Sequence, residues 1–171
     1  VSCFISLMVA YEILSGGYPG ELFKQSLLWI NVPGQDLSFT FNVGIYIDTL
    51  TALMLIVVSF ISTLVVIYSV GYMHEEGEKK RRYYAIISLF IGVMLGLVLA
   101  SNYLQMFIFW ELVGLCSYLL IGFWFHKPSA AAAAKKAFIV TRIGDLGLLA
   151  ALVLVFREVP VAAFDIAEIQ H

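Results

Sequence analysis

Charged residues are scarce in this sequence, and their scarcity excludes several classes of protein. They make up 13% of the 171 residues, whereas hydrophobic residues make up 61% and the mean hydropathy is +0.94. Soluble domains contain about 25% charged residues. The formal net charge is only −2, and no basic stripe is interleaved with aromatic residues, so binding of nucleic acid is excluded. The composition predicts a protein that lies in the lipid bilayer.

Cysteines and cofactor motifs are also few or absent. Cys3 and Cys116 lie in apolar segments, without a C-x-x-C motif and without a His at metal-ligand spacing. This pattern supports neither a disulfide framework nor a zinc or iron–sulfur site. The sequence also lacks a glycine-rich dinucleotide motif after a strand and a pair of intramembrane histidines for haem. We therefore expect no cofactor in this chain, and a protein that moves charge.

Several apolar runs are long enough to cross a bilayer, and they predict the fold class. As a single helix, the run 85–125 would be about 60 Å long, roughly twice the hydrocarbon thickness. It must therefore fold back, and Ser101-Asn102 is the polar pair suited to the turn. We predict an all-α integral membrane fold, a polytopic transmembrane helix bundle over 49–156 with one partial span at 1–14. Its four complete spans are expected at about 49–71, 85–100, 103–125 and 136–156.

The segments between the spans differ in charge, which predicts their side of the membrane. Lys and Arg gather in 72–84 and 126–136, whereas the other connectors hold only Lys24 and, at the edge, Arg157. Because cytoplasmic loops are enriched in Lys and Arg, we place these two basic loops in the cytoplasm. The loop 15–48, the turn at 101–102 and the loop that starts at 157–171 are then extracytoplasmic.

The ends of the chain and its first loop give two weaker indications. Residues 15–48 contain several Pro and Gly residues, and 38–47 partly alternates polar with apolar side chains, which leaves a short strand pair open within a loop. The chain begins at Val1 inside an apolar run, without an initiator Met and without the features of a signal peptide. We therefore expect an internal fragment of a longer protein.

Glu111 is the most unusual residue of the apolar segments. It lies eight residues into the span 103–125, about 12 Å along a helix and so close to the middle of the membrane. A charge at this depth costs at least about 2.5–3.5 kcal/mol, so such a residue should face the bundle interior or water. Two interpretations stay open: a protonated carboxyl that bonds a neighbouring helix, and a site that binds and releases a proton.

Arg142 and Asp145 are two further charged residues at membrane depth. Their spacing of i, i+3 places them on one face of the last span, where they can form an ion pair. Such a pair could be purely structural or could take part in charge transfer. Because the pair would satisfy itself, we expect Glu111 to be the less satisfied of the three. The predicted site is thus Glu111 for proton translocation, with Arg142 and Asp145 as ion-pair partners.

Residues 109–124, with the sequence F-W-E-L-V-G-L-C-S-Y-L-L-I-G-F-W, allow a family to be suggested. They closely resemble the chain 5 (L-type) antiporter-like subunits of respiratory complex I, the proton-pumping NADH:quinone oxidoreductase. Tyr68 with the segment 71–73, and the segments 97–102 and 136–145, resemble the same family. The resemblance covers roughly 45–156.

The resemblance implies a long subunit of many transmembrane helices in two inverted repeats, each with a broken helix. In that family the Glu of the W-E-x-V-G segment, which Glu111 matches, pairs with a Lys further along the chain, and the segment matched by 142–145 lies near it. This Lys falls beyond His171, so residues 1–171 could not translocate a proton by themselves. NAD, FMN, iron–sulfur clusters and quinone are expected on other subunits of the complex. Its other membrane subunits and the lipid bilayer are the expected partners.

Two other functions remain open at this point. The A subunit of a multisubunit sodium/proton antiporter shares this segment and carries out no redox chemistry. A purely structural bundle, in which the three charged residues serve as interhelical pairs, is also compatible with the sequence. For the location we expect the bacterial plasma membrane, with the mitochondrial inner membrane and the thylakoid membrane as alternatives.

Overall fold

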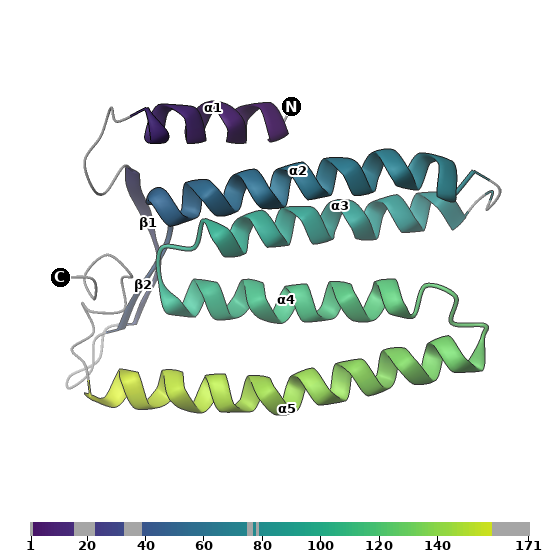
Figure 1. Cartoon of the computed structure of the whole chain (residues 1–171). Coiled ribbons are helices and arrows are strands. Elements are labelled where there is room, and N and C mark those ends of the chain that lie inside the picture. The colour runs from purple at the N-terminus through teal and green to yellow at the C-terminus, as the bar shows by residue number, and fades with distance from the viewer. Residues whose placement is uncertain (1, 16–22, 33–38, 75–76, 78, 159–171) are drawn as a thin grey trace.

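The computed structural model describes residues 2–15, 23–32, 39–74, 77 and 79–158. Within them it forms five helices and two strands, drawn in Figure 1. The elements are α1 Ser2–Leu14, β1 Phe23–Val32, β2 Phe39–Ile47, α2 Thr49–Tyr72, α3 Lys79–Val98, α4 Tyr103–Ile121 and α5 Pro128–Glu158. Helices that are neighbours in sequence pack side by side, from α2 on α1 to α5 on α4. The predicted loop at 157–171 lies, from residue 159 on, outside the described residues, as does the side chain of Cys3.

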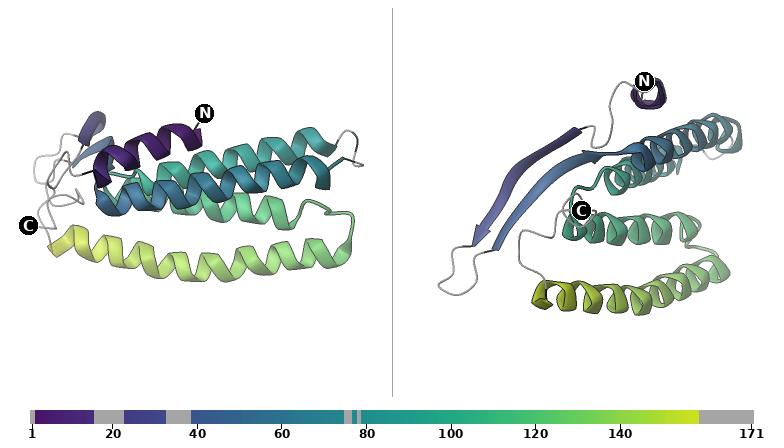
Figure 2. Two further views of the ribbon diagram at one scale, coloured as in Figure 1. Left: turned by 45° about the horizontal axis from the view of Figure 1, so that its top comes forward. Right: turned by 60° about the vertical axis from the view of Figure 1, so that its left-hand side comes forward.

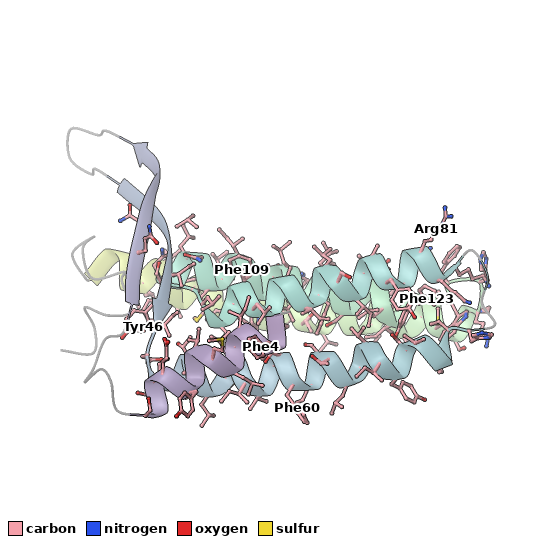
Figure 3. All side chains as sticks on the ribbon, turned by 90° about the horizontal axis from the view of Figure 1, so that it is seen from above. Phe4, Tyr46, Phe60, Arg81, Phe109 and Phe123 are labelled. Carbon is pink, nitrogen blue, oxygen red and sulfur yellow. The ribbon has the colours of Figure 1, made fainter. Side chains whose placement is uncertain are left out.

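Four helices, α2 to α5, are long and apolar enough to cross a membrane. The prediction of a polytopic helical membrane protein with four complete spans is therefore confirmed. The helix α1 is apolar but has only 13 residues, fewer than the roughly 20 that a span needs. Large hydrophobic side chains are exposed along the outer faces of the helices, as lipid requires, and Figure 3 shows Phe60 pointing outward from α2. Further examples are Leu53 and Ile67 on α2 and Ile139, Ile143 and Leu146 on α5.

The segment 15–48, predicted as a loop in which a short strand pair was left open, contains a β-hairpin. Its strands β1 and β2 pair antiparallel from Phe23↔Ile47 to Val32↔Phe39, with an irregularity between Leu28 and Ile30. The strands extend well beyond the stretch 38–47 in which polar and apolar residues alternate. The hairpin projects sideways from one end of the bundle, as Figure 2 shows.

A polar cluster attaches this hairpin to the turn between α3 and α4. The Gln105 side chain bonds both backbone groups of Gly44: its Oε1 accepts from the Gly44 N–H at 3.0 Å and its Nε2 donates to the Gly44 carbonyl at 2.9 Å. Asn102 Nδ2 donates to the Asn42 carbonyl at 2.5 Å. A side chain at Gly44 would clash, because its Cβ would lie 2.6 Å from Ser101 Oγ. The hairpin is therefore held on the end of the bundle by paired polar groups.

The ends of the helices differ from the predicted spans in ways that local chemistry explains. α3 begins at Lys79 rather than at 85, because Lys and Arg are good helix formers. α4 begins at Tyr103 as expected, with the Asn102 side chain accepting from the Gln105 N–H at 2.8 Å, but ends at Ile121 rather than 125. α5 begins at Pro128 rather than 136, since Pro suits the first turn and the Ala run that follows favours a helix.

The connections α2–α3 and α4–α5 lie at the same end of the bundle, and the hairpin and the 101–102 turn lie at the other (Figure 1). Arg81 lies at the end of the bundle opposite the hairpin, as Figure 3 shows. The segments predicted to be basic loops therefore gather at one end.

Candidate functional site

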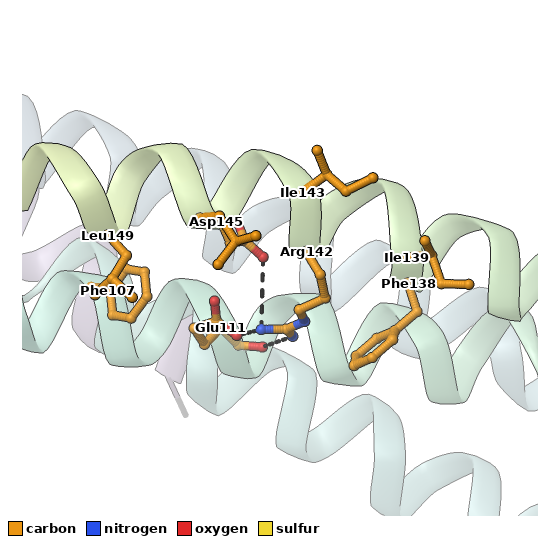
Figure 4. A pocket seen from close by; sticks show the side chains of 9 residues that line it. Phe107, Glu111, Phe138, Ile139, Arg142, Ile143, Asp145 and Leu149 are labelled. Carbon is orange, nitrogen blue, oxygen red and sulfur yellow. Dashed lines mark hydrogen bonds and ion pairs between the residues drawn. The ribbon is translucent and has the colours of Figure 1, made fainter.

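Three charged residues of the spans meet where α4 packs against α5. Glu111 lies near the middle of α4, and Arg142 lies on the facing side of α5. Arg142 Nη1 forms an ion pair with Glu111 Oε2, and Arg142 Nη2 donates a hydrogen bond to the Glu111 backbone carbonyl at 3.2 Å. One guanidinium thus binds both the side chain and the main chain of the same residue (Figure 4).

Asp145 completes the cluster. Its Oδ2 lies 3.7 Å from Arg142 Nη1, which is an ion pair between residues on one face of α5. Its Oδ1 accepts a hydrogen bond of 2.9 Å from the indole Nε1 of Trp110, on α4. Asp145 is only 9% exposed, so its carboxylate lies in a largely buried place, with one oxygen hydrogen-bonded to Trp110 and the other at ion-pair distance from Arg142.

The structure brings the three predicted site residues together and adds a pairing across the helix interface. Arg142 and Asp145 form the expected ion pair at 3.7 Å, but the pair does not leave Glu111 aside, because Arg142 also forms an ion pair with Glu111. The long Arg142 side chain reaches α4, while its guanidinium stays close to Asp145, one turn away on α5. Arg142 therefore lies between two carboxylates that come from different helices.

Trp110 is a member of the site that the sequence analysis did not single out. Its signal was available, because side-chain N–H donors are few in apolar runs and this one directly precedes Glu111. A buried carboxylate requires donors, and indole N–H groups near the membrane interior seek acceptors. Trp110 and Glu111 are consecutive on α4. They bind Asp145 and Arg142, which lie one turn apart on α5.

The surroundings of Arg142 fix its position further. Its guanidinium lies over the Phe138 ring, with Cζ 4.6 Å from the ring centroid, a favourable cation–π arrangement. A Cβ on Gly114 would lie 3.3 Å from Arg142 Nη2, so the absence of a side chain at this position gives the guanidinium room. Arg142 Nε is buried and has no hydrogen-bond partner among the described residues, so this N–H is available to donate a further hydrogen bond.

An open cavity of about 320 Å³ adjoins this cluster. Phe107, Phe138 and Leu149 are among its apolar lining residues, and Glu111, Arg142 and Asp145 are its charged ones. Within the part of the chain that the structure describes, no three His, Cys, Asp or Glu side chains lie close enough to hold a metal ion. Two carboxylates that compete for one cation form a site that can respond to a proton, because protonation of either carboxylate changes which one the cation prefers.

Four apolar helices with an intramembrane cluster of two carboxylates and one arginine define the class: the chain is part of a polytopic integral membrane protein with a charged site inside the bundle. Two family models match in succession. The model of NADH-ubiquinone oxidoreductase (complex I), chain 5 N-terminus, matches residues 29–84, and the transmembrane model of the NADH:quinone oxidoreductase and Mrp antiporter subunits matches residues 100–169. The chain belongs to this family of antiporter-like subunits, of the chain 5 type.

Individual relatives agree with this assignment. The F(420)H(2) dehydrogenase subunit L of Methanosarcina mazei is 52% identical over 90% of this chain and 22% of its own length. The chloroplast NAD(P)H-quinone oxidoreductase subunit 5 of Anthoceros angustus is 48% identical over 87% of this chain and 20% of its own length. The NADH-quinone oxidoreductase subunit L of Neisseria meningitidis is 43% identical over 91% of this chain and 22% of its own length. This chain therefore spans about a fifth of the length of these curated relatives.

A solved structure shares the fold. The Mrp complex from a Dietzia species contains a chain that matches with a TM-score of 0.67 and 27% identity, over 91% of this chain and 16% of that one. The arrangement of helices seen here is thus found in an experimentally determined member of an antiporter assembly.

Proposed function

We propose that this chain is part of a proton-translocating membrane subunit of an NADH:quinone oxidoreductase of the complex I type. The observation that carries the proposal is the position of Arg142, paired with Glu111 across the α4–α5 interface while Asp145 lies 3.7 Å from the same nitrogen. The names of the curated relatives, which are subunits of NADH-quinone, NAD(P)H-quinone and F(420)H(2) oxidoreductases, support the choice of complex.

Each state of the cluster follows from the charges. When Glu111 is ionised, Arg142 binds it, and the two opposite charges compensate one another in an apolar environment. When Glu111 receives a proton, its attraction for the guanidinium falls, and Arg142 turns toward the ionised Asp145. Loss of the proton reverses the movement. A proton at Glu111 is thereby coupled to the displacement of a positive charge along α5.

The remainder of the protein would drive this exchange. The family resemblance adds a lysine beyond residue 171 that pairs with the Glu111 carboxylate, and a cation that approaches and leaves Glu111 would favour release and uptake of the proton in turn. NAD, FMN, iron–sulfur clusters and quinone belong, in this proposal, to other subunits, so this chain receives redox energy only through conformational or electrostatic change. Glu111, Arg142 and Asp145 are the residues that respond.

The orientation proposed from charge agrees with the arrangement of the helices. The segments around 72–84 and 126–136 gather at one end of the bundle and carry most of the Lys and Arg residues, which favours the cytoplasm for that end. The hairpin and the 101–102 turn would then face the other side. We propose the bacterial plasma membrane as the location.

A sodium/proton antiporter is the second candidate function, and the structural similarity to a chain of the Mrp complex supports it. In that case the same cluster would exchange protons against a sodium gradient, with no quinone chemistry in the assembly. The two are distinguished in membrane vesicles that contain the complete protein with its partner subunits: proton uptake driven by electron transfer to a quinone supports the first function, and proton movement driven by a sodium gradient supports the second.

The site itself is tested by Glu111→Gln in the complete protein. The proposal predicts intact assembly of the complex and loss of the proton uptake that this subunit contributes. A purely structural bundle predicts the reverse, a change in assembly or thermal stability with unchanged proton transport per assembled complex.

A further inference from the structure

Asp145 has two partners of different kinds, the Trp110 indole and the Arg142 guanidinium, and only Arg142 is shared with Glu111. Its Oδ1 is held at 2.9 Å by the neutral indole N–H of Trp110, and its Oδ2 lies 3.7 Å from the guanidinium. The guanidinium is in turn paired with Glu111 and bonded to the Glu111 carbonyl at 3.2 Å. The strength of the interaction between Asp145 and Arg142 therefore depends on the hydrogen bond that Trp110 donates to Asp145.

We propose that Trp110 is a positioning residue that sets how Arg142 is divided between Glu111 and Asp145. This inference rests on the proposed function, because it concerns the same cluster, and it assigns a role to a residue outside the charged set. By satisfying one oxygen of Asp145 without adding charge, the indole allows that carboxylate to remain in place while Arg142 stays with Glu111. Trp110 acts through Asp145 and does not itself carry a proton.

The geometry indicates that Trp110 positions Asp145 through its indole N–H rather than through packing of its ring. Trp110 is 50% exposed, so much of its ring contributes little to packing within the described part of the chain. The nitrogen nevertheless reaches Asp145, which is 9% exposed. Phe at this position would keep the aromatic ring and remove the donor. A buried carboxylate oxygen that loses its donor keeps the full cost of its desolvation, so it favours any arrangement that supplies another donor.

Removal of the N–H has a predictable consequence for Arg142. Asp145 then needs another donor, and the guanidinium is the neighbour that can supply it, because its Nε is buried and has no partner among the described residues. Arg–carboxylate pairs favour a two-bond arrangement. Asp145 would then bind the guanidinium more closely, and the ion pair between Arg142 and the Glu111 carboxylate would weaken.

The pairing of Glu111 with Arg142 can be measured separately from transport, through the chemical reactivity of the Glu111 carboxyl. A hydrophobic carbodiimide reacts with intramembrane carboxyl groups, and mass spectrometry of the α4 peptide reports the rate at Glu111. In the complete protein within its complex, Trp110→Phe is expected to raise that rate several-fold. Asp145→Ala is expected to lower it, because Arg142 then has only Glu111 to bind, and the double variant should behave like Asp145→Ala alone.

Trp124→Phe is the matched control, since Trp124 follows α4 and its described ring contacts are with Tyr72, Phe123 and Lys127, away from the cluster. It should leave the Glu111 rate unchanged. If Trp110→Phe impairs assembly, benzothienylalanine at position 110 keeps the shape of the indole and lacks the N–H, and the same rise is expected.

The inference is overturned if Trp110→Phe or its isostere leaves the Glu111 rate at the wild-type value, or if Trp110→Phe still raises it when Asp145 is absent. Failure of the proposed function looks different: Glu111→Gln would then leave proton uptake intact, whatever the labelling rates show.

Discussion

Arg142 on α5 is bound to Glu111 on α4 through both the side chain and the backbone carbonyl, the latter at 3.2 Å. This pairing joins the two helices near the middle of α4, within their membrane-spanning segments. It also accounts for the presence of both charges in apolar runs, because each is compensated by the other.

Loss of one partner of this pair should destabilise the protein more than loss of both. Arg142→Met leaves Glu111 without its cation, and we expect a loss of about 3 kcal/mol, at the low end of values for broken buried pairs because both side chains are partly exposed. The double variant Glu111→Met with Arg142→Met should recover most of that loss. Thermal unfolding of the complete subunit in detergent checks both; equal losses in the single and double variants would contradict the pairing.

The packing of α3 against α4 depends on Gly96. A Cβ at this position would clash with the ring of Phe109 on α4, so Gly96→Ala should force the helices apart and cost about 1–3 kcal/mol. Gly92, one turn earlier on α3, is the matched control, because nothing lies within 4 Å of a Cβ there. A lower unfolding temperature for Gly96→Ala than for Gly92→Ala is the expected result, and equal temperatures would show that the two helices do not meet at this point.

Attachment of the hairpin depends on Gln105. Gln105→Met removes both bonds to Gly44 and leaves a buried N–H and a buried carbonyl unpaired, at a cost of about 1–3 kcal/mol for each. Amide hydrogen exchange at 42–46 should become faster, while exchange in the middle of α2 should not change. Gln25→Met, at an exposed position of β1, is the control and should leave the exchange at 42–46 as it is in the wild type.

The proposed orientation is checked by cysteine labelling in intact cells. With Cys3 and Cys116 replaced by Ala, single cysteines at His74 and His126 should react only after the membrane is made permeable, because both lie at the basic end of the bundle. A cysteine at Ser15, exposed beside the end of α1, should react in intact cells. Labelling of all three positions from the same side would contradict the four-span topology.

Much of the fold follows from features that the sequence displays directly. The fold-back at 101–102 is fixed because a single helix over 85–125 would be about twice as long as the membrane is thick. The meeting of Arg142 and Asp145 on one face follows from their i, i+3 spacing. These relations are local, so one helix or one span is enough to define them.

The features that the sequence analysis missed depend on contacts between distant segments. The hairpin is attached through Gln105 and Gly44, 61 residues apart, and the local sequence around neither residue predicts this contact. The division of Arg142 between two helices likewise depends on how α4 and α5 turn toward one another, which helical spacing does not determine. Trp110 belongs to the site for the same reason, since its acceptor lies 35 residues away.

Proton translocation per electron in liposomes that contain the complete complex is the most direct test of the role of Glu111. With Glu111→Gln, the account predicts that quinone reduction continues to be catalysed while fewer protons are moved for each electron, and that Glu12→Gln, at an exposed position of α1, keeps the wild-type ratio. An unchanged ratio in an intact Glu111→Gln complex would contradict it.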